Sequence, residues 1–170
     1  MLSNVFLKSL RDERKALALW GVGTALLIAM MVAFYPSIKD NEQIEELVET
    51  YPENLLALMG IENLADISSG AGYLSLELFG FMAPLLFTIY AVRLGSGAVA
   101  GEESRGTLEV LLSEPITRGR LVVQKAAAMV SATVLLAVVY WAVLAIGAAG
   151  AGMDVSPLRL AAATFGLLLL

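Results

Sequence analysis

The sequence GEESRGTLEVLLSEPITRGRLVVQK, residues 101–125, is the polar stretch around which the chain is organised. It contains four glutamates and four basic residues, and an apolar run long enough to cross a bilayer lies on each side. Three leucines after Thr107 share one helix face by their i, i+3, i+4 spacing: Leu108, Leu111 and Leu112. Thr107 can cap this helix and Pro115 ends it. We therefore expect a short amphipathic helix held just outside the membrane, between two spanning helices.

The composition indicates a membrane protein. The 170-residue chain is 58% hydrophobic and 16% charged, with a mean hydropathy of +0.78, whereas globular domains carry roughly 25% charged residues. A net charge of -5 and the lack of a basic stripe argue against a nucleic-acid partner. The chain has no Cys and no His, which removes disulfides, thiolate or imidazole metal sites and nucleophile–histidine catalysis. We therefore expect neither a metal nor another cofactor.

Three apolar runs have the length of transmembrane helices: residues 16–35, 74–100 and 121–149. A helix needs about 20 residues to cross roughly 30 Å of hydrocarbon. Trp20 and Tyr35 lie near the ends of the first run, where interfacial aromatic residues are common. Pro84 should kink the second helix. The run 158–170 is too short to span, so we expect the start of a fourth helix in a chain that is a fragment or ends in a stub.

Residues 1–15 and 36–73 differ sharply in charge. The first segment places apolar residues on one helix face and four basic residues beside the headgroups, so we expect an interfacial helix; an unstructured basic lead is the alternative. Residues 36–73 contain eight acids and one base, Lys39, and we expect one or two short amphipathic helices there. Five Lys or Arg residues lie between positions 93 and 125. The positive-inside rule therefore predicts a cytoplasmic N-terminus, a cytoplasmic 101–120 segment and an outer 36–73 loop.

Several residues outside this segment have alternative interpretations. Glycine clusters beginning at Gly21 and Gly95 resemble a dinucleotide fingerprint, but both lie in predicted spanning helices, where helix packing explains them better. No GxxxxGK[ST] phosphate loop is present, so we expect no nucleotide hydrolysis by that route. Glu77 is a candidate ion-coupling carboxylate, although its place at a helix edge favours a hydrated side chain. For Arg93 we expect a side chain that extends to the headgroups.

From the residues alone, the 101–120 helix has two interpretations. It is either a surface helix lying on the inner leaflet or a docking element for a soluble partner.

A longer pattern in the same region resembles the signature of the ABC-2 type permeases, the membrane subunits of one class of ATP-binding-cassette transporters. The signature is E-x-x-x-G-T-L-E-x-L-L, then P-[IV]-[ST]-R, then a Lys or Arg that opens the next helix. The matching residues are Glu102, Gly106, Thr107, Leu108, Glu109, Leu111, Leu112, Pro115, Ile116, Thr117, Arg118 and Lys125. The surrounding YPENLLALMG and FGFMAPLLFTIYAVRLGSGAVAGEE segments are similar to the same subfamily, so the resemblance covers nearly the whole chain.

The resemblance implies that residues 101–120 are the coupling helix, which inserts into a cleft on a separate cytoplasmic ATPase subunit. The leucine stripe would be the buried contact, and Gly106 would allow the turn before the helix. Polar contacts at the rim would come from Glu102, Glu103, Arg105 and Glu109. Such permeases usually have six spanning helices and work as dimers with two ATPases.

We therefore expect a single all-α transmembrane domain over residues 1–170, in the plasma membrane and without catalytic chemistry of its own. The implied partners are an ABC ATPase subunit, a second permease subunit that is identical or different, and the lipid bilayer. The implied function is ATP-driven transport, most simply export, of a substrate that the sequence does not specify. The alternatives are a membrane anchor or assembly subunit that transports nothing, and an ion-coupled carrier that uses Glu77.

Overall fold

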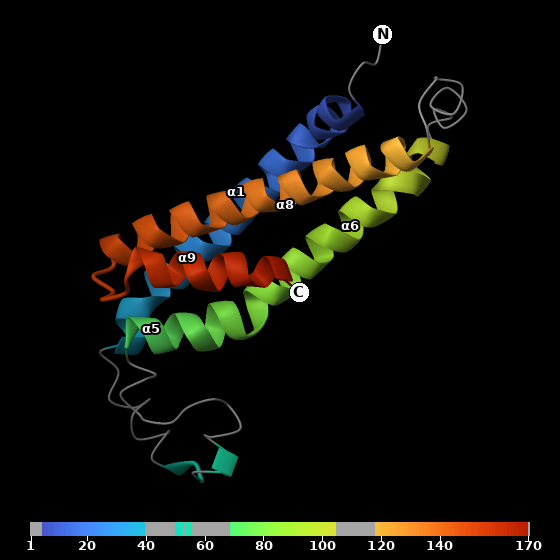
Figure 1. Ribbon diagram of the computed structural model, residues 1–170. Helices are drawn as coiled ribbons and strands as arrows, with labels where there is room; N and C mark the ends of the chain where they lie inside the picture. The colour runs from blue at the N-terminus through green and yellow to red at the C-terminus, as the bar shows by residue number, and fades with distance from the viewer. Residues whose placement is uncertain (1–4, 40–49, 53, 56–68, 105–117, 170) are drawn as a thin grey trace.

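The computed structural model of the chain describes residues 5–39, 50–52, 54–55, 69–104 and 118–169. Within these ranges the chain forms helices joined by turns, and there is no strand (Figure 1). Three helices are long and apolar enough to span a membrane: Val5–Lys39, Gly70–Gly97 and Gly119–Gly150. The predicted all-α, polytopic fold with three complete spanning helices is confirmed.

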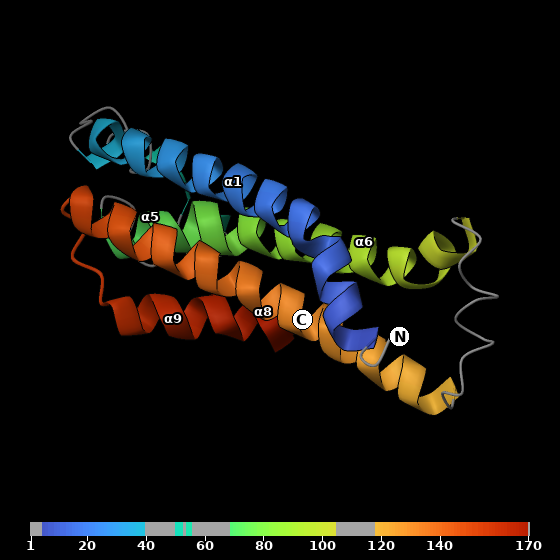
Figure 2. The ribbon, with the colours of Figure 1, turned by 90° about the horizontal axis from the view of Figure 1, so that it is seen from above.

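The first helix, α1 (Val5–Lys39), is continuous over 35 residues and joins the basic lead to the first apolar run. Its one proline is Pro36, so no proline interrupts the helical hydrogen bonds between the lead and the apolar run. At 1.5 Å per residue the helix is about 50 Å long, which exceeds the ~30 Å of hydrocarbon. The N-terminal turns bend away from the rest of the helix (Figure 2). That these turns lie in the membrane interface stays a prediction.

The second spanning helix consists of three consecutive segments: α5 (Gly70–Tyr73), the π-helix η1 (Leu74–Met82) and α6 (Ala83–Ser104). Ser69 caps its start, because the Ser69 Oγ accepts a hydrogen bond of 3.0 Å from the Gly72 N–H. Pro84 has no N–H to donate, and just before it the Ala83 N–H bonds to the Leu78 carbonyl in the wider π pattern. The helix changes direction between α5 and α6 (Figure 1), as predicted for Pro84.

The C-terminal part contains three helices: α8 (Arg118–Gly150), α9 (Pro157–Gly166) and the 3-10 helix η2 (Leu167–Leu169). Gly152 has a φ of +66° and reverses the chain after α8. The Trp141 Nε1–H donates a hydrogen bond of 3.0 Å to the Pro157 carbonyl, which fixes the start of α9 against α8. The described part of the predicted 158–170 run is therefore helical and packs back along α8 (Figure 1).

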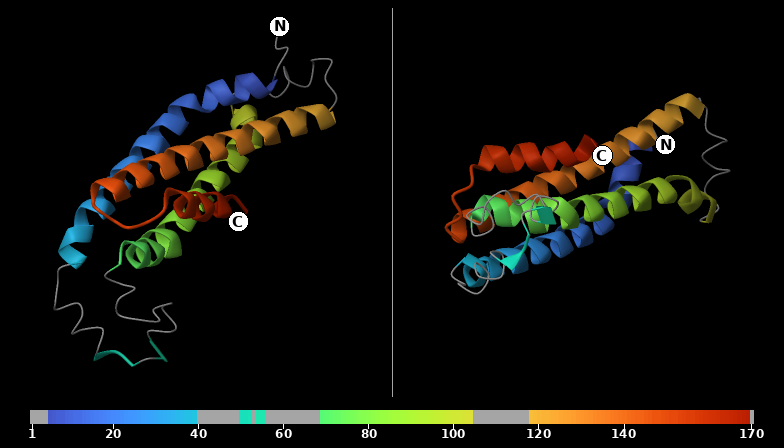
Figure 3. Two further views of the ribbon diagram at one scale, coloured as in Figure 1. Left: turned by 60° about the vertical axis from the view of Figure 1, so that its left-hand side comes forward. Right: turned by 90° about the horizontal axis from the view of Figure 1, so that it is seen from below.

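Helix α8 is the common packing partner of the bundle. Helix α1 packs along α8, and both α6 and α9 also contact it (Figure 3). Gly147 allows the close crossing with α1, since a Cβ at this position would lie 3.1 Å from the Val32 Cγ2. The Tyr73 hydroxyl donates a hydrogen bond of 2.9 Å to the Met31 carbonyl, which joins α5 to α1. The largest fully buried side chains of this core are Ile28, Leu74, Leu78, Tyr140 and Leu144.

Large apolar side chains also cover the outside of the bundle. Leu19 on α1 is 73% exposed, and on α8 Val123 is 67% exposed and Ile146 is 74% exposed. Soluble monomers rarely expose apolar patches on this scale. The exterior therefore suits lipid as its surroundings.

Candidate functional site

The docking segment, defined as residues 101–120, connects two helices whose ends lie at the same end of the bundle. Helix α6 ends at Ser104 and α8 begins at Arg118. The N-terminal end of α1 lies at this same end, whereas the C-terminal end of α1 and the start of α5 lie at the other (Figures 1 and 3). The docking segment and the basic lead, which are separated by about 90 residues of sequence, thus belong to one end of the molecule.

The structure describes only the borders of the predicted docking residues. Glu102 and Glu103 lie in the last turn of α6, and Arg118 is the first residue of α8. The remaining predicted docking residues lie outside the described residues: Arg105, Gly106, Thr107, Leu108, Glu109, Leu111, Leu112 and Pro115. The short amphipathic helix and its leucine stripe therefore stay a prediction.

The described basic residues gather at the docking end. At this end they are Lys8, Arg11, Arg14, Lys15, Arg93, Arg118, Arg120 and Lys125. The opposite end carries Lys39 at the end of α1 and Arg159 in α9. This distribution agrees with a cytoplasmic docking end by the positive-inside rule.

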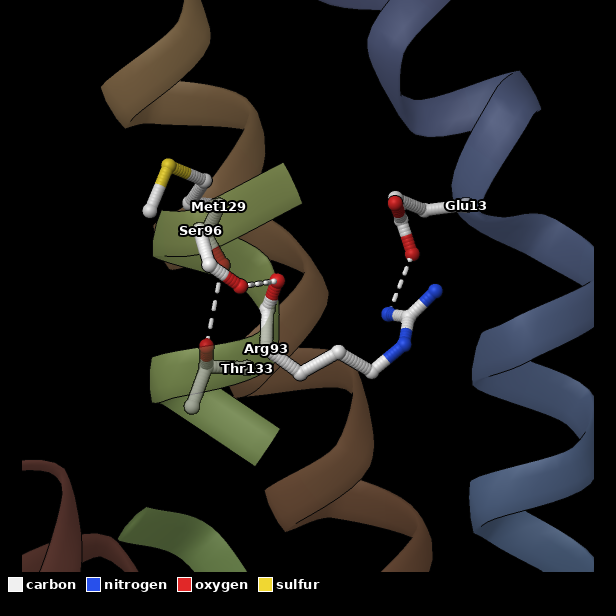
Figure 4. A network of polar contacts seen from close by, with 5 residues as sticks. All are labelled: Glu13, Arg93, Ser96, Met129 and Thr133. Atoms are coloured by element: carbon white, nitrogen blue, oxygen red, sulfur yellow. Dashed lines mark hydrogen bonds and ion pairs between the residues drawn. The ribbon is translucent and has the colours of Figure 1, made fainter. Parts of the chain in front are cut away.

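An ion pair joins α1 to α6 near this end. The Arg93 Nη1 donates to the Glu13 Oε2 at 2.7 Å, and the two side chains are 39% and 30% exposed (Figure 4). The guanidinium extends from α6 to α1 and meets a carboxylate, while the expected extension of Arg93 to the headgroups stays a prediction. Sequence reasoning missed Glu13, an acid within a basic segment, because 80 residues separate it from its partner.

An aromatic contact lies one turn from the ion pair on α6. The rings of Trp20 in α1 and Tyr90 in α6 have centroids 5.4 Å apart and planes inclined by 58°. Tyr90 is fully buried in a small core with Leu94, Ala132 and Leu136, which connects α6 to α8. The ion pair and the ring contact both join α1 to α6 near the docking segment, and Leu10 and Leu17 of α1 also pack against the small core.

The other hydrogen bonds drawn around Arg93 stay within single helices. The Ser96 hydroxyl donates to the Arg93 carbonyl at 3.1 Å, and the Thr133 hydroxyl donates to the Met129 carbonyl at 3.0 Å (Figure 4). Hydroxyl groups bonded to carbonyls of the preceding turn are satisfied in an apolar environment without a second helix. These two hydrogen bonds therefore stabilise α6 and α8 individually.

Two features lie away from the docking end. Glu77 is exposed in the π-helix η1, on the same spanning helix as Arg93 but in its opposite half. An apolar groove of about 570 Å³ runs between α1 and α8, with Ile28, Pro36 and Gly147 among its lining residues. Among the described residues, no group of three or more Asp or Glu side chains is placed to hold a metal ion.

An all-helical bundle with three spanning helices, an apolar exterior and basic residues at one end defines a multi-pass membrane protein. The profile described as ABC-2 family transporter protein matches residues 3–170, nearly the whole chain, and the chain belongs to this family. The family consists of permease subunits of ABC transporters, which are generally non-catalytic and work with an ABC ATPase subunit. Among curated proteins and solved structures, no match was found.

Proposed function

We propose that this chain is the permease subunit of an exporter in the plasma membrane, driven by ATP hydrolysis on a separate subunit that docks on residues 101–120. The observation that carries the proposal is the position of this segment. It directly continues α6 and leads directly into α8, at the end of the bundle that holds most of the described basic residues. With the N-terminus cytoplasmic, the segment faces the compartment that contains ATP.

The two helices that border the docking segment, α6 and α8, are suited to transmit a movement of this segment into the membrane. Helix α6 has 22 residues and α8 has 33 residues, and neither contains a break in its helical hydrogen bonding as far as the structure describes them. A helix held by a moving partner shifts as a rigid body, and closely packed interfaces switch between discrete arrangements. A displaced docking segment would therefore tilt α6 and α8 together and re-pack the bundle around them.

The leucine stripe is the proposed buried contact with the ATPase subunit, and the flanking charged residues set its register. A second permease subunit completes the transporter. An apolar stripe buried in a cleft tolerates no carboxylate, because an unpaired buried charge is strongly destabilising.

Co-purification tests the proposal. The full-length chain, expressed with its ABC ATPase partner, is compared with Leu111→Asp and with Ser113→Asp, which adds the same charge about 200° away on the predicted helix. We expect Leu111→Asp to lose the ATPase subunit while still inserting in the membrane, and Ser113→Asp to retain it. Equal recovery of the ATPase with both variants contradicts docking through the stripe and favours a helix that lies on the inner leaflet.

A further inference from the structure

The links between α1 and α6 are made by long side chains across a shared neighbour. Both helices pack on α8, and Figure 4 shows Arg93 reaching from α6 past α8 to Glu13 on α1. We call Glu13, Arg93, Trp20 and Tyr90 the α1–α6 bridge. Its ion pair measures 2.7 Å and its ring centroids are 5.4 Å apart.

Arg93 is a charged residue within a spanning helix, and this position explains its pairing with Glu13. Arg93 lies inside the spanning helix that begins at Gly70, and this helix continues to Ser104. A charged residue within a spanning helix needs a partner or water, and Glu13 provides a carboxylate for it. Arg93 is the only basic residue between Gly70 and Gly97. Exposed basic residues of the lead, such as Arg14, can contact water directly.

The position of the bridge connects it to the docking segment. Arg93 precedes the end of α6 at Ser104 by 11 residues, about 16 Å of helix. Glu13 lies in the N-terminal part of α1, the helix whose N-terminal turns bend away from the rest (Figure 2). The bridge therefore joins the helix that leads into the docking segment to a helix that is distant from that segment in sequence.

We propose that the α1–α6 bridge makes α1 move with α6 when the docking segment is displaced, with Glu13 and Arg93 as positioning residues for transport. The proposal rests on the proposed function, because it needs an ATPase that moves the segment. The ring contact of Trp20 with Tyr90 sets the spacing of the helices, and the ion pair prevents them from sliding along one another. Without the pair, α6 moves on α8 while α1 stays behind.

Spin labels measure this directly, because the chain has no Cys and introduced thiols are therefore the sole labelling sites on it. Labels at Lys15→Cys on α1 and Ser96→Cys on α6, both exposed positions, report the distance between the helices. The distance is recorded for the full transporter without nucleotide and with ATP trapped by a hydrolysis-deficient ATPase subunit. The unmutated bridge is compared with Glu13→Gln, with Arg93→Gln, with the exchange Glu13→Arg plus Arg93→Glu, and with the control Arg14→Gln.

We expect the α1–α6 distance to be the same in both nucleotide states for the unmutated bridge and for Arg14→Gln. In each single bridge variant it should change on ATP binding by about 2 Å or more, the scale of helix shifts in switching proteins. The charge exchange should restore the constant distance, which a merely structural loss of folding would not do. A nucleotide-dependent change with the bridge intact, or a constant distance in the single variants, overturns the proposal.

Failure of the proposed function is distinguishable from failure of the bridge. If no ATPase subunit co-purifies with the unmutated chain, the proposed function is wrong. If the ATPase co-purifies with every variant and the distances do not depend on the bridge, the bridge proposal alone is wrong.

Discussion

Gly70 lies against Met153 in the turn after α8, and this contact gives a sharp prediction. Gly70 is buried at the start of α5, and a Cβ at this position would lie 2.7 Å from the Met153 Cβ and 3.3 Å from the Met153 Cα. Real Cβ atoms do not approach other atoms this closely, and the Met153 atoms concerned are attached directly to the backbone. Gly70→Ala therefore requires the turn after α8 to move away from α5.

The expected cost follows from the overpacking of a well-packed site. Inserting an extra methyl group that forces backbone shifts destabilises by about 1–3 kcal/mol, which is roughly a 5- to 150-fold change in the unfolding equilibrium. Helix propensity works in the opposite direction, because replacing Gly by Ala within a helix is favourable by up to about 1 kcal/mol. The matched control is Gly23→Ala in α1, where a Cβ meets no atom within 4 Å.

The assay is the unfolding of the purified protein in detergent, followed by far-UV circular dichroism against added denaturing detergent. We expect Gly70→Ala to unfold at a lower concentration than the unmutated protein, and Gly23→Ala at an equal or higher one. Equal stability of the two variants would refute the close packing of α5 on the turn after α8.

Three further predictions concern single positions. The buried Tyr140 hydroxyl has no hydrogen-bond partner among the described residues, so Tyr140→Phe should keep the ring contacts with Phe79 and Phe87 and raise the free energy of unfolding by up to about 1–3 kcal/mol. A lower unfolding midpoint in the same assay would instead reveal a partner for the hydroxyl. Gly152→Ala should cost about 1–2 kcal/mol, because an L-residue at a φ of +66° is strained, and an unchanged midpoint would contradict the turn geometry. Glu77→Gln should leave the ATPase activity of the reconstituted transporter, with and without an imposed proton gradient, unchanged, and a gradient effect that disappears in Glu77→Gln would instead support ion coupling.

The sequence predicted the spanning helices well because their signal is local. A run of about 20 apolar residues has few alternatives in a bilayer, and the kink follows from the missing N–H of Pro84. The π-helix Leu74–Met82 that precedes the proline was not predicted, since no residue pattern distinguishes it from an α-helix. The continuity of α1 from Val5 to Lys39 was also missed, because a change of composition was interpreted as a change of element.

The side-chain contacts between helices could not be predicted from the sequence, for a different reason. Nothing local in Glu13 or Arg93 identifies the other residue as its partner, and the pairing depends on both helices packing against α8. For Arg93 the sequence reasoning expected an extension to the headgroups and named no partner. The docking helix itself, within residues 101–120, depends on the family signature and on its amphipathic pattern, and it stays a prediction.

Cross-linking from the leucine stripe tests the central claim most directly. A photoactivatable maleimide is attached to Leu111→Cys, which is the sole thiol of the chain, in membranes that contain the complete transporter. The same probe at Ser113→Cys is the control on the opposite side of the predicted helix. The account predicts an adduct with the ABC ATPase subunit that is strong from position 111 and weak from position 113. Adducts from position 111 with lipid alone would contradict it and would place the segment on the inner leaflet.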